Sequence, residues 1–247
     1  MRPPLLAPTR RIFELALGEM LWARRTVFMA AVAGAPVLLA IVTRLALANG
    51  SSVLIINGGR VDNAATFGTA ISVLYLRFIV PALGLFYGTS LIADEVEDKT
   101  ITYLFTRPIA RGAIVLGKYF AYLLCVISVV LPSVALVFMV MVPFRDMGML
   151  FRALVSDLGL ITLGLAAYGA VFLWAGVSFK RPLVAGLVFI FGWEQVALTL
   201  PGYLRHLTIA YYLQAATVSV TSLIVMIIAA VFVAMRTIER REYVLEQ

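Results

Sequence analysis

Residues 91–122 read L-I-A-D-E-V-E-D-K-T-I-T-Y-L-F-T-R-P-I-A-R-G-A-I-V-L-G-K-Y-F-A-Y. This stretch holds the densest charge in the chain. Its charged residues begin with Asp94, Glu95, Glu97, Asp98 and Lys99. A long apolar run lies on each side of it. Apolar runs of about 20 residues cross a bilayer as helices. The charged stretch between two such runs must therefore lie in water or against a soluble protein.

The overall composition points the same way. The chain has 247 residues, of which 62% are hydrophobic and 13% charged, and its mean hydropathy is +1.00. Soluble domains are about a quarter charged, so these values exclude an ordinary soluble domain. The length suits one membrane domain of several helices. We expect no nucleic-acid binding from the net charge of +7, because the basic residues gather at the ends of the apolar runs.

Six apolar runs are long enough to span a membrane. They are residues 27–48, 71–92, 119–142, 154–179, 183–200 and 218–235. Lipid excludes open sheet edges, so the runs are expected to be helices. The sequence therefore predicts an all-α membrane protein with six transmembrane helices, in a single domain that covers residues 1–247.

Two further segments are expected to be helical outside these spans. Residues 9–25 predict an interfacial helix, with a basic, partly ordered tail as the alternative. Its apolar side would consist of Ile12, Phe13, Ala16, Leu17 and Met20. Residues 201–217 are rich in aromatic and apolar side chains, which indicates either a re-entrant helical piece or an aromatic-rich loop.

The distribution of Lys and Arg predicts the orientation in the membrane. Fourteen of the 20 flank one set of span ends: Arg2, Arg10, Arg11, Arg24, Arg25, Lys99, Arg107, Arg111, Lys118, Lys180, Arg181, Arg236, Arg240 and Arg241. Only four flank the other set: Arg60, Arg145, Arg152 and Arg205. Since cytoplasmic loops carry the excess of basic residues, both termini and residues 94–118 are predicted to face the cytoplasm.

The sequence predicts neither a metal site nor a nucleotide site in this chain. Cys125 is the single cysteine and His206 the single histidine, and no third ligand accompanies Glu194 and His206, so no metal site is expected. Residues 112–118 fit the first part of a phosphate-binding loop. However, Tyr119 stands where Ser or Thr must ligate magnesium, and no strand precedes the segment. We therefore expect no cofactor in this chain.

Two ionisable residues lie within predicted spans, where charge is costly and usually faces protein or water. Arg77 and Glu194 each lie six residues from the outer end of their spans, or roughly 9 Å deep, so they can pair. One interpretation is an outer gate or a substrate contact. The other is a structural ion pair within one subunit, or an Arg77 side chain that extends outward to water.

The second span also contains small residues at a packing interval. Gly84 and Gly88 form a G-x-x-x-G motif, which permits close helix contact in membranes, and Pro81 before them favours a bend. Such a motif serves either a dimer contact or ordinary packing, because small residues are common in these spans.

The polar stretch itself predicts two short helical pieces. Pro108 breaks helix continuity, which separates residues 95–107 from the helix that starts near Arg111. The first piece presents Ile101, Tyr103, Leu104 and Phe105. These apolar groups need a surface to bury against, in this protein or in a partner.

Residues 95–118 resemble the cytoplasmic signature of ABC-2 type transporter permeases. The matching residues are Glu95, Thr100, Leu104, Pro108, Ile109, Arg111, Gly117 and Lys118. Lys99 stands where many members have Gly. Within the family, the chain most resembles six-helix permeases of the nitrous-oxide-reductase maturation type.

The resemblance implies partners and site residues. Two permease subunits, here expected to be identical, would join two copies of a separate ABC ATPase that holds ATP and magnesium. Residues 94–112 would form the coupling helix seated in the ATPase. The residues implied to contact it are Glu95, Glu97, Thr100, Tyr103, Leu104, Arg107 and Arg111, although Arg107 and Arg111 can instead bind lipid phosphates. Spans two and five would line the dimer interface and the translocation path, which makes Arg77, Gly84, Gly88 and Glu194 candidate path or gate residues.

The expected function follows from that resemblance. The chain would be a multi-pass permease subunit in the cytoplasmic membrane, part of an ATP-driven exporter, and not itself an enzyme. The alternative is a non-transporting membrane subunit that couples ATP hydrolysis to a signalling or assembly partner. A membrane-embedded enzyme ranks third, because the sequence offers no catalytic constellation.

Overall fold

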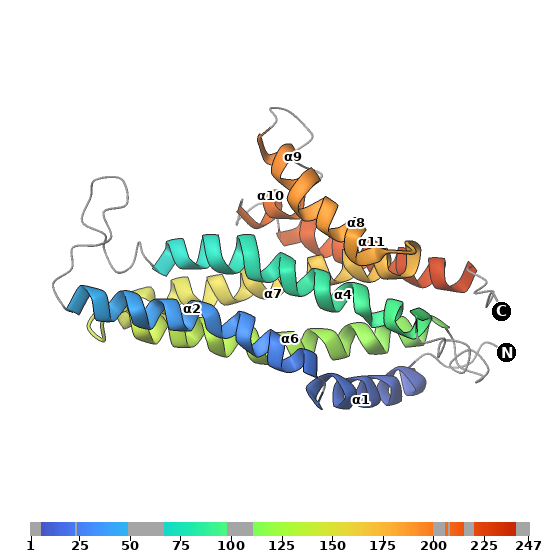
Figure 1. Ribbon diagram of the computed structural model, residues 1–247, viewed down its shortest axis with the longest axis horizontal. Helices are drawn as coiled ribbons and strands as arrows, with labels where there is room; N and C mark the ends of the chain where they lie inside the picture. Colours follow the sequence, from blue (N-terminus) through green and yellow to red (C-terminus); the bar gives the residue numbers. More distant parts are fainter. Residues whose placement is uncertain are drawn as a thin grey trace.

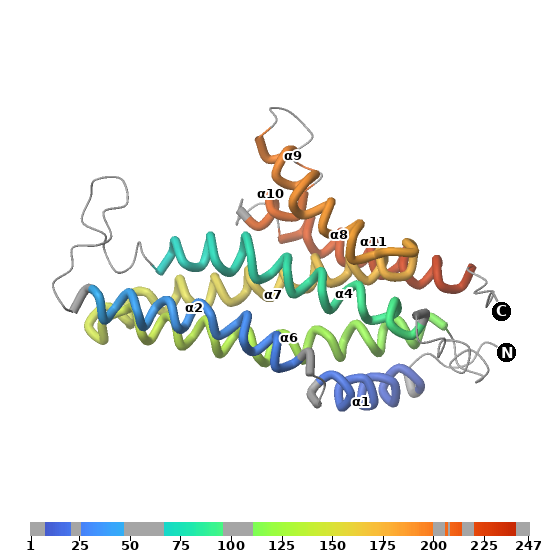
Figure 2. Tube along the Cα trace, viewed as in Figure 1, coloured from blue at the N-terminus to red at the C-terminus, as the bar shows by residue number. Residues whose placement is uncertain are grey.

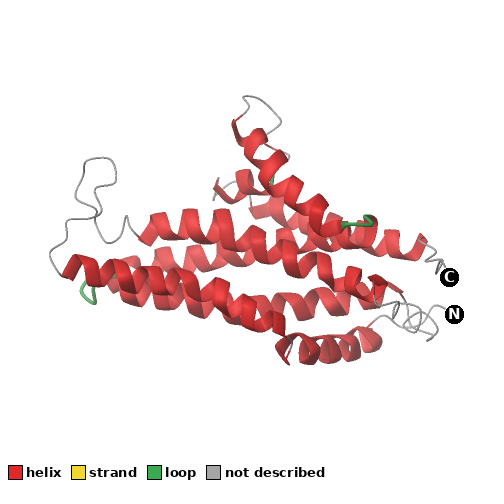
Figure 3. Ribbon diagram, viewed as in Figure 1, coloured by secondary structure: helices red, strands yellow, loops and turns green. Residues whose placement is uncertain are grey.

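A computed structural model describes residues 6–22, 24–48, 67–97, 111–199, 206, 208–214 and 220–240. The elements in chain order are α1 (Leu6–Trp22), α2 (Arg24–Ala48), η1 (Ala70–Ile79), α4 (Val80–Glu97), α6 (Arg111–Met141), α7 (Met147–Ser178), α8 (Pro182–Leu187), η2 (Val188–Glu194), α9 (Gln195–Thr199), α10 (Ile209–Gln214) and α11 (Val220–Arg240). Within those ranges every element is helical and no strand occurs, which confirms the all-α prediction (Figure 3).

In the part of the chain that the structure describes, six helices are long and apolar enough to cross a membrane. They are Thr26–Ala46, Phe67–Glu95, Arg111–Met141, Met147–Ser178, Pro182–Thr199 and Val220–Arg240. Each contains most of one predicted run, so the six predicted spans are confirmed. The third begins at Arg111 rather than at residue 119, because residues 111–118 continue the helix beyond the apolar run.

The spans run largely alongside one another (Figure 1). Helices α2, α4, α6 and α7 follow the long axis of the molecule, while α8 and α9 lean away from it with α10 close by. The start of α1, the end of α4, the start of α6 and the end of α11 gather at one end, as the chain trace in Figure 2 also shows. This is the end that the basic residues predict to be cytoplasmic. The side of the membrane itself stays a prediction.

Helix α1 confirms the helical alternative for the N-terminal segment. Its side chains divide as predicted, since Ala16 is buried and Ile12, Phe13, Leu17 and Met20 are partly buried. This face packs on the first part of α6. The predicted place of α1 at the membrane interface is not tested by this contact.

The most extensive helix contact joins α4 and α7, and glycines make it possible. A Cβ atom on Gly84 would lie 2.5 Å from the Cβ of Tyr168, and one on Gly88 would lie 2.9 Å from the Cβ of Phe172. From the other side, a Cβ on Gly176 would lie 2.5 Å from the carbonyl oxygen of Thr89. The G-x-x-x-G motif of the second span therefore packs inside the subunit, against α7.

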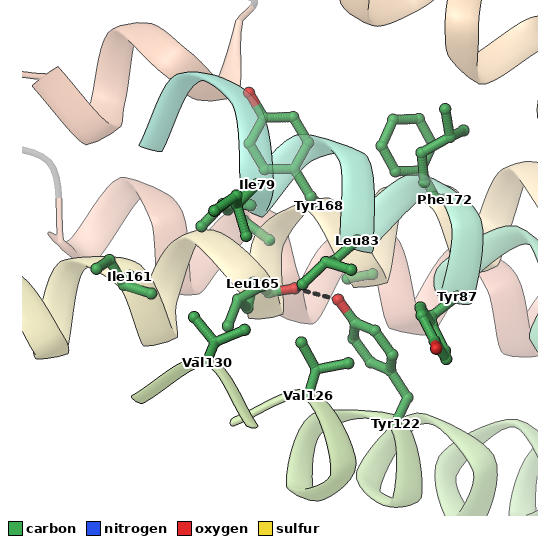
Figure 4. Close-up of a cluster of buried hydrophobic side chains, with 14 of the residues drawn as sticks. Ile79, Leu83, Tyr87, Tyr122, Val126, Val130, Ile161, Leu165, Tyr168 and Phe172 are labelled. Atoms are coloured by element: carbon green, nitrogen blue, oxygen red, sulfur yellow. Dashed lines mark hydrogen bonds between the residues drawn. The ribbon is translucent and has the colours of Figure 1, made fainter. Parts of the chain in front are cut away.

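Tyrosine hydroxyls tie the central helices together. The hydroxyl of Tyr122 donates to the Leu165 carbonyl at 3.0 Å (Figure 4), and that of Tyr119 donates to the Ala166 carbonyl at 2.9 Å. Both bonds join α6 to α7. Interhelical hydrogen bonds in membranes contribute about 0.6 kcal/mol each on average. They therefore add modestly to the packing and set how the two helices are rotated.

Among the described residues, two segments of the spans are π-helical, a rare geometry that is frequent at functional sites. Segment η1 contains Arg77, and η2 ends at Glu194. At the end of η1, the N–H of Val80 bonds the carbonyl of Tyr75, five residues back. Pro81 follows and has no N–H, so the Arg77 carbonyl lacks its usual α-helical donor. The structure thus shows a π-helical segment just before Pro81, and the bend predicted there stays a prediction.

We predict that Gly84→Leu destabilises the fold, because the new side chain would collide with α7. Forcing extra methylenes into a packed contact costs about 1–3 kcal/mol, and here it would also separate two helices. Thermal unfolding in detergent measures the effect. Gly159→Leu is the matched control, since a Cβ at Gly159 meets nothing within 4 Å. Equal unfolding midpoints for the two variants would contradict the glycine contact.

Candidate functional site

The predicted ATPase-contact residues fall into three groups. Thr100, Tyr103, Leu104 and Arg107 lie outside the described residues, as do all of residues 98–110. Glu97 ends helix α4, and its side chain is not described. Glu95 and Arg111 are described, at the two ends of the predicted coupling segment. The structure therefore shows how that segment is rooted, and the coupling helix itself stays a prediction.

Glu95 and Lys118 join the helices that lead into and out of the segment. The ammonium of Lys118 forms a salt bridge with the Glu95 carboxylate and donates to the Leu91 carbonyl at 2.8 Å. The two charged side chains are only 13% and 20% exposed. Glu95 was predicted to contact a partner protein, but its carboxylate already has this partner within the chain. The bridge holds the end of α4 against the beginning of α6.

Arg111 and Gly112 connect the same place to the last helix. The Arg111 guanidinium makes long contacts of 3.5 Å with the carbonyl oxygens of Ile238 and Glu239. The last carbonyls of a helix have no partner within it and carry partial negative charge, so a cation there is stabilising. Gly112 lies against Met235, where a Cβ would come within 2.7 Å of the Met235 side chain. The start of α6 is thus fastened to the end of α11.

Gly117 provides the contact with α1. A Cβ atom there would lie 2.9 Å from the Thr9 carbonyl oxygen and 2.9 Å from the Ile12 side chain. We call Glu95, Arg111, Gly112, Gly117 and Lys118 the inner junction, because through them α1, α4, α6 and α11 meet. Sequence reasoning noted Gly117 and Lys118 only as parts of a motif. Their packing roles were not predicted.

The segment that resembles a phosphate-binding loop is helical throughout. Residues 112–118 all belong to α6, so they do not form the loop between a strand and a helix that a phosphate cradle requires. Lys118, which would face a phosphate in such a loop, bonds Glu95 instead. Among the described residues, no group of three or more His, Cys, Asp or Glu side chains is placed to hold a metal ion.

At the other end of the molecule, the predicted pairing of Arg77 with Glu194 is wrong. The Arg77 guanidinium donates to the side-chain oxygen of Gln195 at 3.1 Å. Glu194 accepts from the Tyr168 hydroxyl at 2.7 Å and from the Ala210 N–H at 2.9 Å. Neighbouring residues on a helix point roughly a quarter of a turn apart, so Glu194 and Gln195 do not both face η1. The depth of the two residues in their spans correctly predicted that spans two and five are neighbours, but it did not predict how the two helices are rotated.

Glu194 is 2% exposed and connects three parts of the chain. It lies at the end of η2, its hydroxyl partner Tyr168 belongs to α7, and its amide partner Ala210 lies in the first turn of α10. A buried carboxylate is costly unless it is hydrogen-bonded, and the first amides of a helix need acceptors. Here the Glu194 carboxylate accepts from the Ala210 amide, so each group provides the partner that the other requires. The carboxylate therefore holds α10 against span five and α7.

The comparison with known families decides the classification. Residues 18–210 match the family described as ABC-2 family transporter protein, which is more than half of the chain. The chain belongs to the ABC-2 transporter family. No curated protein matches it. The match begins in α1 and extends into α10, so it takes in five of the six spans, the Glu95–Lys118 bridge and the Glu194 contacts.

Membership in the ABC-2 family supports the coarse functional expectations. The chain is a multi-pass membrane protein and the permease subunit of an ABC transporter. Subunits of this kind normally lack an ATPase site of their own and generally work with an ABC ATPase. The inner junction of this ABC-2 permease then lies at the root of the segment that the family resemblance assigns to the ATPase.

We predict that Lys118→Met destabilises the permease by about 2 kcal/mol, because it removes the ammonium that pairs with the largely buried Glu95 carboxylate. Unfolding in detergent, followed by heat or denaturant, measures this loss. Arg10→Gln is the matched control, since the Arg10–Glu14 pair is 83% and 59% exposed and such pairs contribute little. Equal losses of unfolding free energy in the two variants would show that the Glu95–Lys118 bridge does not stabilise the fold.

Proposed function

We propose that this ABC-2 permease pairs with a second copy of itself and with two copies of a separate ABC ATPase, and that it exports a substrate across the cytoplasmic membrane. The observation that carries the proposal is the inner junction. It joins the two ends of the predicted coupling segment to each other and fastens the α6 end to α1 and α11, so a push on that segment reaches four helices. ATP and magnesium would bind to the ATPase subunits.

The proposed transmission begins at residues 98–110. Closure of the ATPase dimer would displace this segment, and the Glu95–Lys118 bridge would make α4 and α6 move together and keep their ends from separating. Arg111 would carry the displacement to the end of α11. Because the glycines of α4 lie directly on α7, the tilt of α4 would also move α7.

The roles of the predicted contact residues divide accordingly. We propose that Glu97, Thr100, Tyr103, Leu104 and Arg107 contact the ATPase, with apolar side chains in its groove and charged ones at the rim. Glu95 and Arg111 act as positioning residues, since each has partners within the chain. Binding of lipid phosphates stays the alternative for Arg107.

Orientation, location and subtype are part of the proposal. The excess of Lys and Arg at the end that holds the inner junction supports a cytoplasmic position for that end, as the ATPase contact requires. The signature in residues 95–118 supports the proposed likeness to permeases of nitrous-oxide-reductase maturation. The second candidate is a subunit that couples ATP hydrolysis to an assembly or signalling partner, which the same inner junction would serve equally.

A photo-crosslinking amino acid at Leu104 tests the ATPase contact. We expect ATP-hydrolysing protein to be captured from native membranes at Leu104 and not at Met149, an 86% exposed control at the opposite end. The captured complex is then reconstituted in liposomes to separate the two candidates. ATP-dependent movement of a compound across the bilayer would support the transporter, and ATP hydrolysis without such movement would support the non-transporting subunit. Capture at Met149 alone, or at neither position, would contradict the proposal.

We further propose that Arg77, Gln195 and Glu194 form an outer gate. Both π-helical segments converge there, and the Arg77–Gln195 bond joins side chains of spans two and five. We expect Arg77→Ala and Glu194→Ala to lower ATP-driven transport about tenfold, which corresponds to about 1.4 kcal/mol in the barrier. ATPase binding should stay normal. Arg152→Ala, at an exposed position near the same end, is the control. Unchanged transport in properly folded variants would remove the gate.

A further inference from the structure

A pocket of about 400 Å³ lies beside the end of α4 that leads to the inner junction. Its walls come from three places: Phe28 near the start of α2, Arg181 to Val184 at the turn into α8, and, on α4, Phe86, Tyr87, Thr89, Ser90, Ala93 and Asp94. It shares no residue with the inner junction or the outer gate. The volume falls within the range of about 300–1,000 Å³ that is usual for small-molecule sites.

One wall of the pocket is apolar and reaches the outer surface of the bundle. The rings of Phe28 and Phe86 meet edge to face, with centroids 5.7 Å apart. Both rings, together with Leu183 and Val184, remain substantially exposed. Exposed apolar side chains within a membrane-spanning segment lie where lipid chains run. A molecule in the pocket can therefore keep an apolar portion in the bilayer.

The other wall carries opposite charges. Asp94 belongs to the last turns of α4, and Arg181 to the turn before α8. Arg181 is exposed, and among the described residues no acidic side chain pairs with its guanidinium. The hydroxyls of Thr89 and Ser90 donate to carbonyls of their own helix, at 2.6 Å and 3.0 Å, which leaves their oxygens as acceptors.

These features define the chemistry of the occupant. A guanidinium binds a phosphate well, because its paired N–H groups match two oxygens. A carboxylate and hydroxyl oxygens suit a primary ammonium, which donates up to three hydrogen bonds. An anionic head group would satisfy Arg181 but would bring like charge to Asp94. A head group with both charges satisfies both sides.

We propose that this pocket binds the head group of a zwitterionic phospholipid that carries a primary amine, such as phosphatidylethanolamine, from the leaflet at the end of the inner junction. The phosphate contacts Arg181, the amine contacts Asp94, and the acyl chains follow Phe28 and Leu183 into the bilayer. The site goes beyond the proposed transport function. Its binding can be measured without an ATPase, so the two proposals fail separately.

The acyl chains of the lipid matter to this assignment as much as the charges of its head group. Each methylene group that leaves water contributes about 0.8 kcal/mol, whereas exposed ionic contacts contribute little on their own. A free head group such as phosphoethanolamine has the two charges but no chains. It should therefore compete poorly with the whole lipid.

The test is lipid retention by the full-length protein, measured by native mass spectrometry after mixing with micelles that contain equal amounts of phosphatidylethanolamine and phosphatidylglycerol. We expect phosphatidylethanolamine to be retained in preference, and excess phosphoethanolamine not to displace it. Arg181→Gln and Asp94→Asn should each lower the preference about fivefold to tenfold. Leu183→Trp, which fills the pocket, should abolish it.

Matched controls come from neighbouring positions. Lys180→Gln removes the adjacent positive charge, and Val188→Trp adds the same bulk at an exposed position of the same span, but neither residue lines the pocket. Both controls should retain the lipid as the unmodified chain does. Arg181 is exposed, so its variant is expected to fold even if Asp94→Asn does not.

Three results would overturn the proposal. One is equal retention in Arg181→Gln, Leu183→Trp and the unmodified chain. Another is preference for phosphatidylglycerol, which would mean that Arg181 alone selects the ligand. The third is full displacement by phosphoethanolamine, which would mean that the pocket takes a soluble zwitterion and not a lipid.

Discussion

The close contact of α4 with α7 is the constraint on which the rest of this permease depends. Helices in lipid gain little from hiding apolar surface, because the lipid is equally apolar, so they associate through tight packing and hydrogen bonds. Gly84 and Gly88 allow that packing from one side and Gly176 from the other. Helix α4 carries Glu95 near one end and follows η1, with Arg77, at the other. The positions of both candidate sites therefore depend on one helix, and the glycines fix where that helix lies.

Polar side chains inside the bundle are used to set helix rotation. Tyr122 bonds a carbonyl of α7, Tyr75 bonds Ser133 on α6 at 2.7 Å, and Glu194 bonds Tyr168. An apolar surface tolerates many rotations, whereas a hydrogen bond between two spans tolerates few. The centre of the permease is thus specified in detail, while the π-helical segments contain Arg77 and Glu194.

The two candidate sites differ in how firmly they join their helices. The inner junction joins four helices through a salt bridge, helix-end carbonyls and glycine contacts, so it resists separation. At the outer site, the described residues that join spans two and five by a hydrogen bond are Arg77 and Gln195, and this bond is exposed to its surroundings. A strong inner connection and a weak outer one suit a protein in which force enters at one end and an opening forms at the other.

The sequence by itself determined the six spans, the amphipathic face of α1 and the family resemblance in residues 95–118. These depend on local properties: the length of an apolar run, the spacing of apolar residues along a helix, and a short motif. Only the tertiary structure decided that Lys118 is the partner of Glu95, that Glu194 turns to Tyr168 and α10 and leaves Arg77 to Gln195, and that the G-x-x-x-G motif is used within the chain. Which side chains meet depends on the rotation and tilt of whole helices. Many packing contacts set these together, and no single stretch of sequence encodes them.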